Sequence, residues 1–129
     1  MDAELEDYFK NRKVYVWAES FAIVKAKKPL PGAFAVIQDK KEITVIIDES
    51  KIKNDDVIKM EKGWKILTFD MILPFELVGF LAKVSKVLAE ANISIFVVSA
   101  YSTDHILVKE KNLPKTIQKL EGSGCIVIK

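Results

Sequence analysis

The residues best suited to chemistry lie in one stretch, from residue 75 to residue 108. Glu76, Val78 and Gly79 occupy the first turns of a predicted helix, and Asp104 follows the end of an apolar predicted strand. Backbone N–H groups at a helix N-terminus can bind a carboxylate, whereas an aspartate binds an ammonium group. If the chain brings the two ends together, the pair suits a small zwitterion.

Few other residues could support catalysis or bind a metal. His105 is the only histidine and Cys125 the only cysteine. Adjacent residues of a strand point to opposite faces, so Asp104 and His105 cannot form a local catalytic dyad. We expect His105 on the strand surface, Cys125 buried as a small hydrophobe, and neither a metal site nor a cofactor.

Composition and charge narrow the classes of partner. Of the 129 residues, 50% are hydrophobic, so the chain can bury a core, and 20 basic against 18 acidic residues give a net charge of +2. This balance does not indicate nucleic acid or membrane. Arg12 is the only arginine, which disfavours a phosphate or nucleic-acid site, because such sites usually recruit the planar guanidinium.

The cellular compartment follows from three further features of the sequence. A single cysteine allows no internal disulfide, which fits a reducing compartment. The first residues are acidic and lack an apolar signal core, and no apolar run approaches the about 20 residues of a membrane helix. We expect a cytoplasmic protein without a membrane partner.

The first half of the chain predicts strands joined by breaks. An amphipathic segment at 2–10 precedes extended segments at 14–17 and 21–26, and prolines then interrupt the chain before a strand at 33–37. Residues 38–41 form a turn to a returning strand at 43–47. The charged stretch 48–62 has room for one or two helical turns, and Gly63 separates it from a strand at 64–69.

Helical periodicity is clearer in the second half. One helical face carries apolar residues at the required spacing, namely Leu77, Leu81, Val84, Leu88 and Ala91, and Asn92 can end that helix. Strands follow at 93–99 and 106–109. Asn112 is placed to cap a short helix whose inward residues are Leu113, Ile117 and Leu120; Gly122 ends it, and 126–128 is the last strand.

Residues 65–129 therefore give the strand and helix order βαββαβ, which is the ferredoxin-like pattern. Residues 13–64 follow a degenerate version of it. We predict an α+β protein of tandem ferredoxin-like units, with antiparallel sheets and helices on one face: a helical leader at 1–12, a degenerate unit at 13–64 and a second unit at 65–129. The strand at 93–98 is apolar on both faces, so we also expect a homodimer.

Three segments resemble the ACT domain family of amino-acid sensors, in particular the regulatory domains of aspartate kinases, the small tandem-ACT proteins and the animal cytosolic arginine sensor. They are FELVG at 75–79, LAEANISI at 88–95 and SAYSTDHILV at 99–108. The resemblance is strong in the second half and modest in the first. It implies ACT units in tandem.

The resemblance also implies a site. In relatives that bind amino acids, the ligand lies where a helix start meets a strand end, at an interface between ACT units. Carried over by position, the ligand-binding residues of this chain are Glu76, Val78, Gly79, Ala100, Tyr101, Thr103 and Asp104. The implied function is a non-catalytic regulatory module that binds a small amino acid and acts on a regulated enzyme. Ala100 departs from the family, which often has threonine there, so one hydroxyl is missing.

Simpler interpretations of these residues remain open. Gly79 can allow close helix packing, and Glu76 can interact favourably with the helix dipole. Asp104 can be a turn residue, and Tyr101 can pack at the rim of the sheet. The chain would then be an interaction or dimerisation module that has lost ligand binding. An acylphosphatase-like enzyme is disfavoured because the loop before Glu76 contains no arginine. RNA binding is disfavoured because the central strands lack paired exposed aromatics.

Overall fold

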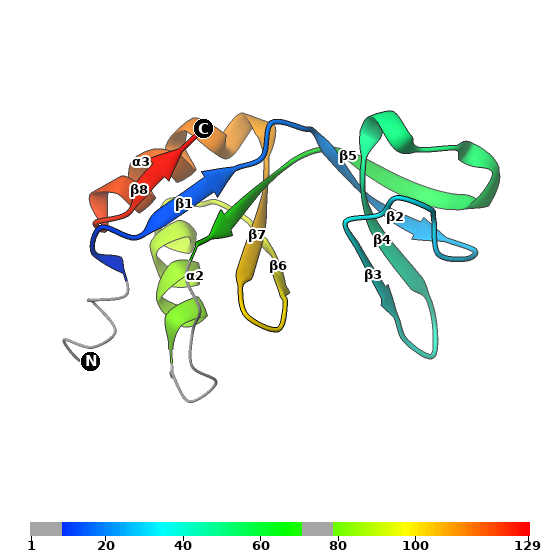
Figure 1. Ribbon diagram of the computed structural model, residues 1–129, viewed down its shortest axis with the longest axis horizontal. Helices are drawn as coiled ribbons and strands as arrows, with labels where there is room; N and C mark the ends of the chain where they lie inside the picture. Colours follow the sequence, from blue (N-terminus) through cyan, green and yellow to red (C-terminus); the bar gives the residue numbers. More distant parts are fainter. Residues whose placement is uncertain (1–8, 71–78) are drawn as a thin grey trace. The chain divides into compact units, whose positions relative to one another are not determined.

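The computed structural model describes residues 9–70 and 79–129 (Figure 1). The chain divides into two compact units. The middle unit is Glu19–Lys65, and the terminal unit combines Met1–Ala18 with Ile66–Lys129. One long strand, β5 (Val57–Phe69), contributes its first part to the middle unit and its end to the terminal unit.

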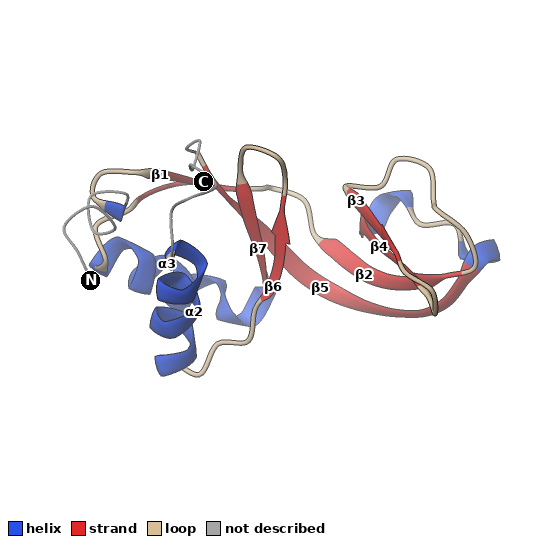
Figure 2. Cartoon of the chain, turned by 90° about the horizontal axis from the view of Figure 1, so that it is seen from below, coloured by secondary structure: helices blue, strands red, loops and turns tan. Residues whose placement is uncertain are grey.

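The terminal unit is a sheet with helices on one face. Its strands lie in the order β6, β7, β5, β1, β8, and Figure 2 shows both helices on the same side of these strands. Besides the end of β5, its elements are β1 (Lys13–Val16), α2 (Phe80–Glu90), β6 (Phe96–Ser99), β7 (Asp104–Lys109), a 3₁₀ turn (Glu110–Asn112), α3 (Leu113–Gly122) and β8 (Ile126–Ile128).

The predicted βαββαβ order of the second half is confirmed as β5, α2, β6, β7, α3 and β8. The prediction of a purely antiparallel sheet is wrong at one place. β1 lies between β5 and β8, and Val14 pairs with Phe69 in antiparallel register and with Val127 in parallel register. Periodicity predicts that a segment is a strand, but it does not predict which strand becomes its neighbour.

Alternation divides the terminal sheet into two faces. Leu67, Phe69, Ile106 and Val108 belong to the core beneath the helices, together with residues of α2 and α3. These include Val84, Leu88, Ala91 and Leu120, as the helical spacing predicted. Ile66, His105 and Leu107 alternate with them, so they lie on the opposite face, and they too are buried.

The middle unit is a sheet of antiparallel strands in the order β3, β4, β2, β5. Its other elements are β2 (Phe21–Ala26), β3 (Ala35–Gln38), β4 (Ile43–Asp48) and two 3₁₀ turns (Glu49–Lys51 and Asn54–Asp56). If the four strands of this unit are numbered by their order in the sequence, their order in the sheet is second, third, first, fourth. The terminal unit has the same order of β6, β7, β5 and β8, with β1 inserted. This shared order supports the predicted tandem; its boundaries at 12/13 and 64/65 remain a proposal.

The middle unit, whose backbone the structure describes throughout, contains no α-helix of its own. A loop at 27–34 and the two 3₁₀ turns stand where a ferredoxin-like unit has helices, as the breaks and short helical turns of the predicted degenerate unit imply. Pro29 and Pro31 explain this in the loop, because proline lacks the N–H that a helix interior needs.

Gly63 was predicted to separate a charged segment from a strand, but β5 continues through it. Phe21 pairs with Trp64 and Ile23 with Glu61, so two residues of β5 face one residue of β2 in a β-bulge. Gly63 lies in this bulge with φ of 83°, a conformation that glycine adopts without strain. Its N–H donates to Glu49 Oε2 at 2.7 Å, which fixes the first 3₁₀ turn to the strand.

Smaller differences concern the ends of elements. β6 begins at Phe96 instead of residue 93, and β7 begins at Asp104 instead of residue 106. Asn92 has φ of 61° just after α2, as predicted for the residue that ends this helix. The Asn112 side chain does not cap α3; its carbonyl accepts a hydrogen bond from Thr116 Oγ1 at 2.8 Å.

Candidate functional site

The start of α2 is fixed by three aromatic rings. Phe80, the first residue of the helix, packs edge-on against Phe69 at a centroid distance of 5.4 Å and stacks on Phe9 at 5.0 Å. Gly79 occupies the N-cap position with φ of 91° and ψ of 3°, so the chain enters the helix through a left-handed residue. A side chain would be strained there, which explains glycine without reference to a ligand.

The second part of the predicted site is the hairpin between β6 and β7. Ser99 pairs with Asp104, and the Ala100 N–H donates to the Thr103 carbonyl at 2.8 Å, which closes the turn. Tyr101 lies in this turn and is 84% exposed. Asp104, the first residue of β7, is half-buried.

The helix start and this hairpin lie at the same end of the terminal sheet (Figure 1). Two contacts with the end of β5 establish this: Phe80 packs on Phe69, and His105 Nδ1 lies 2.7 Å from Thr68 Oγ1. The structure thus brings Gly79 to the same end as the hairpin residues Ala100, Tyr101, Thr103 and Asp104. The other two predicted residues, Glu76 and Val78, lie outside the described residues, and ligand binding by this set remains a proposal.

His105 was predicted on the strand surface, and this is wrong, because it is only 9% exposed. It belongs to a series of polar side chains in contact with one another, on the sheet face away from the helices. Trp17 Nε1 donates to Thr68 Oγ1 at 2.8 Å, and Thr68 Oγ1 contacts His105 Nδ1. Thr103 Oγ1 lies 3.4 Å from His105 Nε2. The apolar run at 106–108 was the sequence signal that β7 is buried on both faces.

The burial of His105 predicts a pH dependence of stability. Burial lowers the pKa of the His105 imidazole below its ordinary value of 6.5, and the Asp104 carboxylate opposes part of this shift. The unfolded chain therefore binds the proton more readily, so stability is fully present above pH 6.5 and is lost as the pH falls through the folded-state pKa. We expect urea denaturation to give a lower free energy of unfolding at pH 5.5 than at pH 7.5.

Replacing the imidazole distinguishes the contribution of His105 to this pH dependence from the contribution of the carboxylates. His105→Gln removes the titrating group, so its unfolding free energy should change much less between pH 7.5 and 5.5. Hydrogen bonds lower the pKa of Asp39 and Asp48 from 3.8, so those groups titrate below this window. An unchanged pH dependence in the variant would mean that His105 is not its source.

Cys125 is buried, as predicted, and burial raises the pKa of its thiol to about 11, so it is protonated at neutral pH.

Within residues 9–70 and 79–129, no three His, Cys, Asp or Glu side chains are grouped to hold a metal. No helix in these ranges has the length and apolar character required to cross a membrane.

The strand order and the helices of the terminal unit define a ferredoxin-like α+β domain. Residues 59–122 match the family model for the ACT domain, and this match runs from near the start of β5 to the end of α3. This part of the chain is similar to the ACT domain family, and the resemblance inferred from the three sequence segments is confirmed.

Solved structures share the fold over most of the chain. A protein from Agobacterium tumefaciens is 25% identical, with 92% of each chain covered and a TM-score of 0.79. The ligand-free regulatory subunit of aspartate kinase from Thermus thermophilus is 7% identical, with 85% of this chain and 95% of that chain covered and a TM-score of 0.64. The allosteric aspartate kinase from Clostridium acetobutylicum is 9% identical, with 85% of this chain and 34% of that chain covered and a TM-score of 0.67.

Proposed function

We propose that this chain is a non-catalytic regulatory module that binds a small amino acid at an interface between ACT units. The observation that carries the proposal is the position of the α2 start and the Asp104 hairpin at one end of a domain similar to the ACT family. Backbone N–H groups near Gly79 would bind the carboxylate of the ligand, and Asp104 would bind its ammonium group.

The structural relatives support a regulatory role. One of them is a regulatory subunit of aspartate kinase, and another is an allosteric enzyme that contains this fold as about a third of its chain. By analogy, the module would change the activity of an enzyme partner when the ligand binds. The ligand must favour one of two conformations, and the size of the effect is bounded by that difference in affinity.

We propose a cytoplasmic homodimer, and the edge strands support the self-association. β3 is an edge strand of the middle unit, and its Val36 and Ile37 are 42% and 44% exposed. β6 and β8 are edge strands of the terminal unit, and they expose Val97 and Ile126. Exposed apolar residues on unpaired edges favour pairing with another chain.

The alternative is an interaction or dimerisation module that has lost ligand binding. Ala100 favours it, since it offers no hydroxyl to a ligand, and so does the exposed Val97. Ile95, in the same apolar segment as Val97, packs partly buried against the core beneath the helices. This reduces the surface that such a partner could use.

A thermal-denaturation screen of the pure protein against each proteinogenic amino acid at millimolar concentration tests the proposal. A ligand that binds only the folded state raises the free energy of unfolding by RT ln(1 + [L]/Kd). We expect one amino acid, or a chemically related pair, to raise the melting temperature in a saturable way. A flat screen, together with a protein complex that amino acids do not affect, would favour the interaction module.

A further inference from the structure

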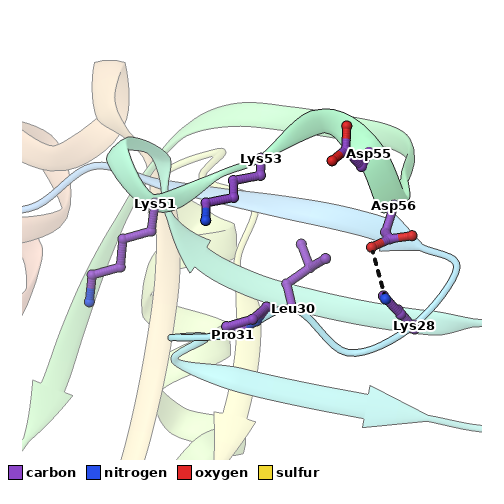
Figure 3. A pocket seen from close by; sticks show the side chains of 7 residues that line it. All are labelled: Lys28, Leu30, Pro31, Lys51, Lys53, Asp55 and Asp56. Carbon is purple, nitrogen blue, oxygen red and sulfur yellow. Dashed lines mark ion pairs between the residues drawn. The ribbon is translucent and has the colours of Figure 1, made fainter.

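The middle unit contains a hollow between the loop after β2 and the segment with the two 3₁₀ turns (Figure 3). Its volume is about 220 Å³, and the side chains that line it are Lys28, Leu30, Pro31, Lys51, Lys53, Asp55 and Asp56. These residues come from the loop after β2 and from the segment that contains the two 3₁₀ turns. The hollow is thus a product of the degenerate unit, where short turns replace helices.

Hydrogen bonds from backbone N–H groups hold both walls of this hollow. The Lys27 N–H donates to the Asp56 carbonyl at 2.8 Å, which joins the loop after β2 to the second 3₁₀ turn. The Asp48 side chain accepts from the Ser50 N–H at 2.9 Å and thereby caps the first turn. The Glu49–Gly63 hydrogen bond ties that turn to β5. The walls are therefore positioned without a ligand, so little ordering is needed on binding.

Charge in the hollow is unevenly compensated, because its lining has three lysines against two aspartates, Asp55 and Asp56. Lys28 and Asp56 form an ion pair at 3.5 Å, so their charges balance each other. In Figure 3 this pair stands on one side of Leu30, and the ammonium groups of Lys51 and Lys53 stand on the other. Among the described residues, neither of these two lysines has a carboxylate within 4.0 Å, although Asp48 lies close enough to feel the charge of Lys51.

Apolar groups form the remaining lining. Leu30 is 9% exposed and belongs to the core of the middle unit, and Pro31 lies beside it in the hollow. The aliphatic stem of Lys51 passes close to Gly32, since a Cβ there would lie 3.4 Å from Lys51 Cδ. Two ammonium groups next to an apolar floor match an organic anion better than a bare inorganic ion.

We propose that this hollow binds a small organic anion, whose carboxylate or phosphate lies between Lys51 and Lys53 and whose apolar part lies on Leu30 and Pro31. The volume limits the ligand to a small metabolite, because pockets for drug-sized molecules span roughly 300–1,000 Å³. Lysine binds carboxylate and phosphate alike as a point charge. The site lies in the middle unit and does not depend on the amino-acid site proposed in the terminal unit.

NMR titration of the full chain tests this site, with backbone amide shifts as the readout. The probes are butyrate, propyl phosphate and inorganic phosphate, each at constant ionic strength, with sodium chloride as the blank. We expect saturable shifts of amides at 28–32 and 51–56 with butyrate or propyl phosphate, and the tighter of the two identifies the headgroup. Inorganic phosphate should bind more weakly, because it lacks an apolar part.

Variants of the two lysines make the test specific. Lys53→Gln and the double variant Lys51→Gln with Lys53→Gln should weaken binding roughly tenfold or more, because each removes a charge-assisted hydrogen bond. Lys53→Arg should retain binding, and Lys40→Gln, at an exposed lysine in the β3–β4 turn, is the matched control. Shifts that never saturate, that chloride reproduces, or that the double variant leaves unchanged would overturn the proposal.

Discussion

Phe69→Ala should lower the free energy of unfolding by about 3–5 kcal/mol, which is the cost of removing a buried phenyl ring from a packed core. Phe69 is fully buried at the end of β5 and packs edge-on against Phe80. It therefore connects the sheet to the first residue of α2. Because a domain is stable by only about 5–15 kcal/mol, this single change removes a large part of the total. Urea denaturation monitored by circular dichroism measures the loss.

Two further variants separate the loss of the ring from general effects of substitution. Phe69→Leu keeps most of the apolar volume, so it should cost no more than about 1.5 kcal/mol. Ile58→Ala changes a residue of the same strand that is 50% exposed, and it should cost about 1 kcal/mol or less. If Phe69→Ala costs no more than Ile58→Ala, the ring does not hold α2 in place.

Much of the fold could be predicted because its local signals agree with one another. In the second half, helical spacing, Asn92 after α2 and the alternating apolar strands all indicate βαββαβ, and the structure has this order. In the first half, Pro29 and Pro31 break the chain where a helix would be expected. The insertion of β1 between β5 and β8 could not be predicted, because strand pairing depends on contacts between residues distant in the sequence.

Candidate sites were harder to predict than the fold. Gly79 and Asp104 were selected as neighbours of a ligand, and the βαββαβ order brings them to the same end of the sheet. His105 was misplaced because its burial depends on Trp17 and Thr68, which lie far from it in the sequence. The hollow around Leu30 left no sequence signal, since lysines in a charged segment such as Lys51 and Lys53 usually form a solvated surface.

Asp104→Asn should remove most of the stabilisation that the amino-acid ligand confers, if the proposed site is right. A ligand at about 100 times its Kd stabilises the folded chain by about 2.7 kcal/mol. Loss of a carboxylate that binds the ligand's ammonium group should weaken binding at least about tenfold, which leaves about 1.4 kcal/mol or less at the same concentration. Thermal denaturation at pH 7.5, with and without the amino acid found in the screen, measures both values.

The measurement is made at a pH where His105 does not titrate, and it is paired with a control variant of equal charge change. Asp104 also raises the pKa of His105, so its removal lowers that pKa further, but at pH 7.5 the imidazole is neutral in either case. Glu121→Gln removes one negative charge from an exposed residue of α3, away from the hairpin, and should leave the ligand effect unchanged. If Asp104→Asn keeps the full stabilisation while the unmodified chain shows it, the ligand binds elsewhere. Changes in the amide shifts at 100–104 would place the ligand at the hairpin between β6 and β7. Changes at 28–32 and 51–56 would instead place it in the hollow of the middle unit.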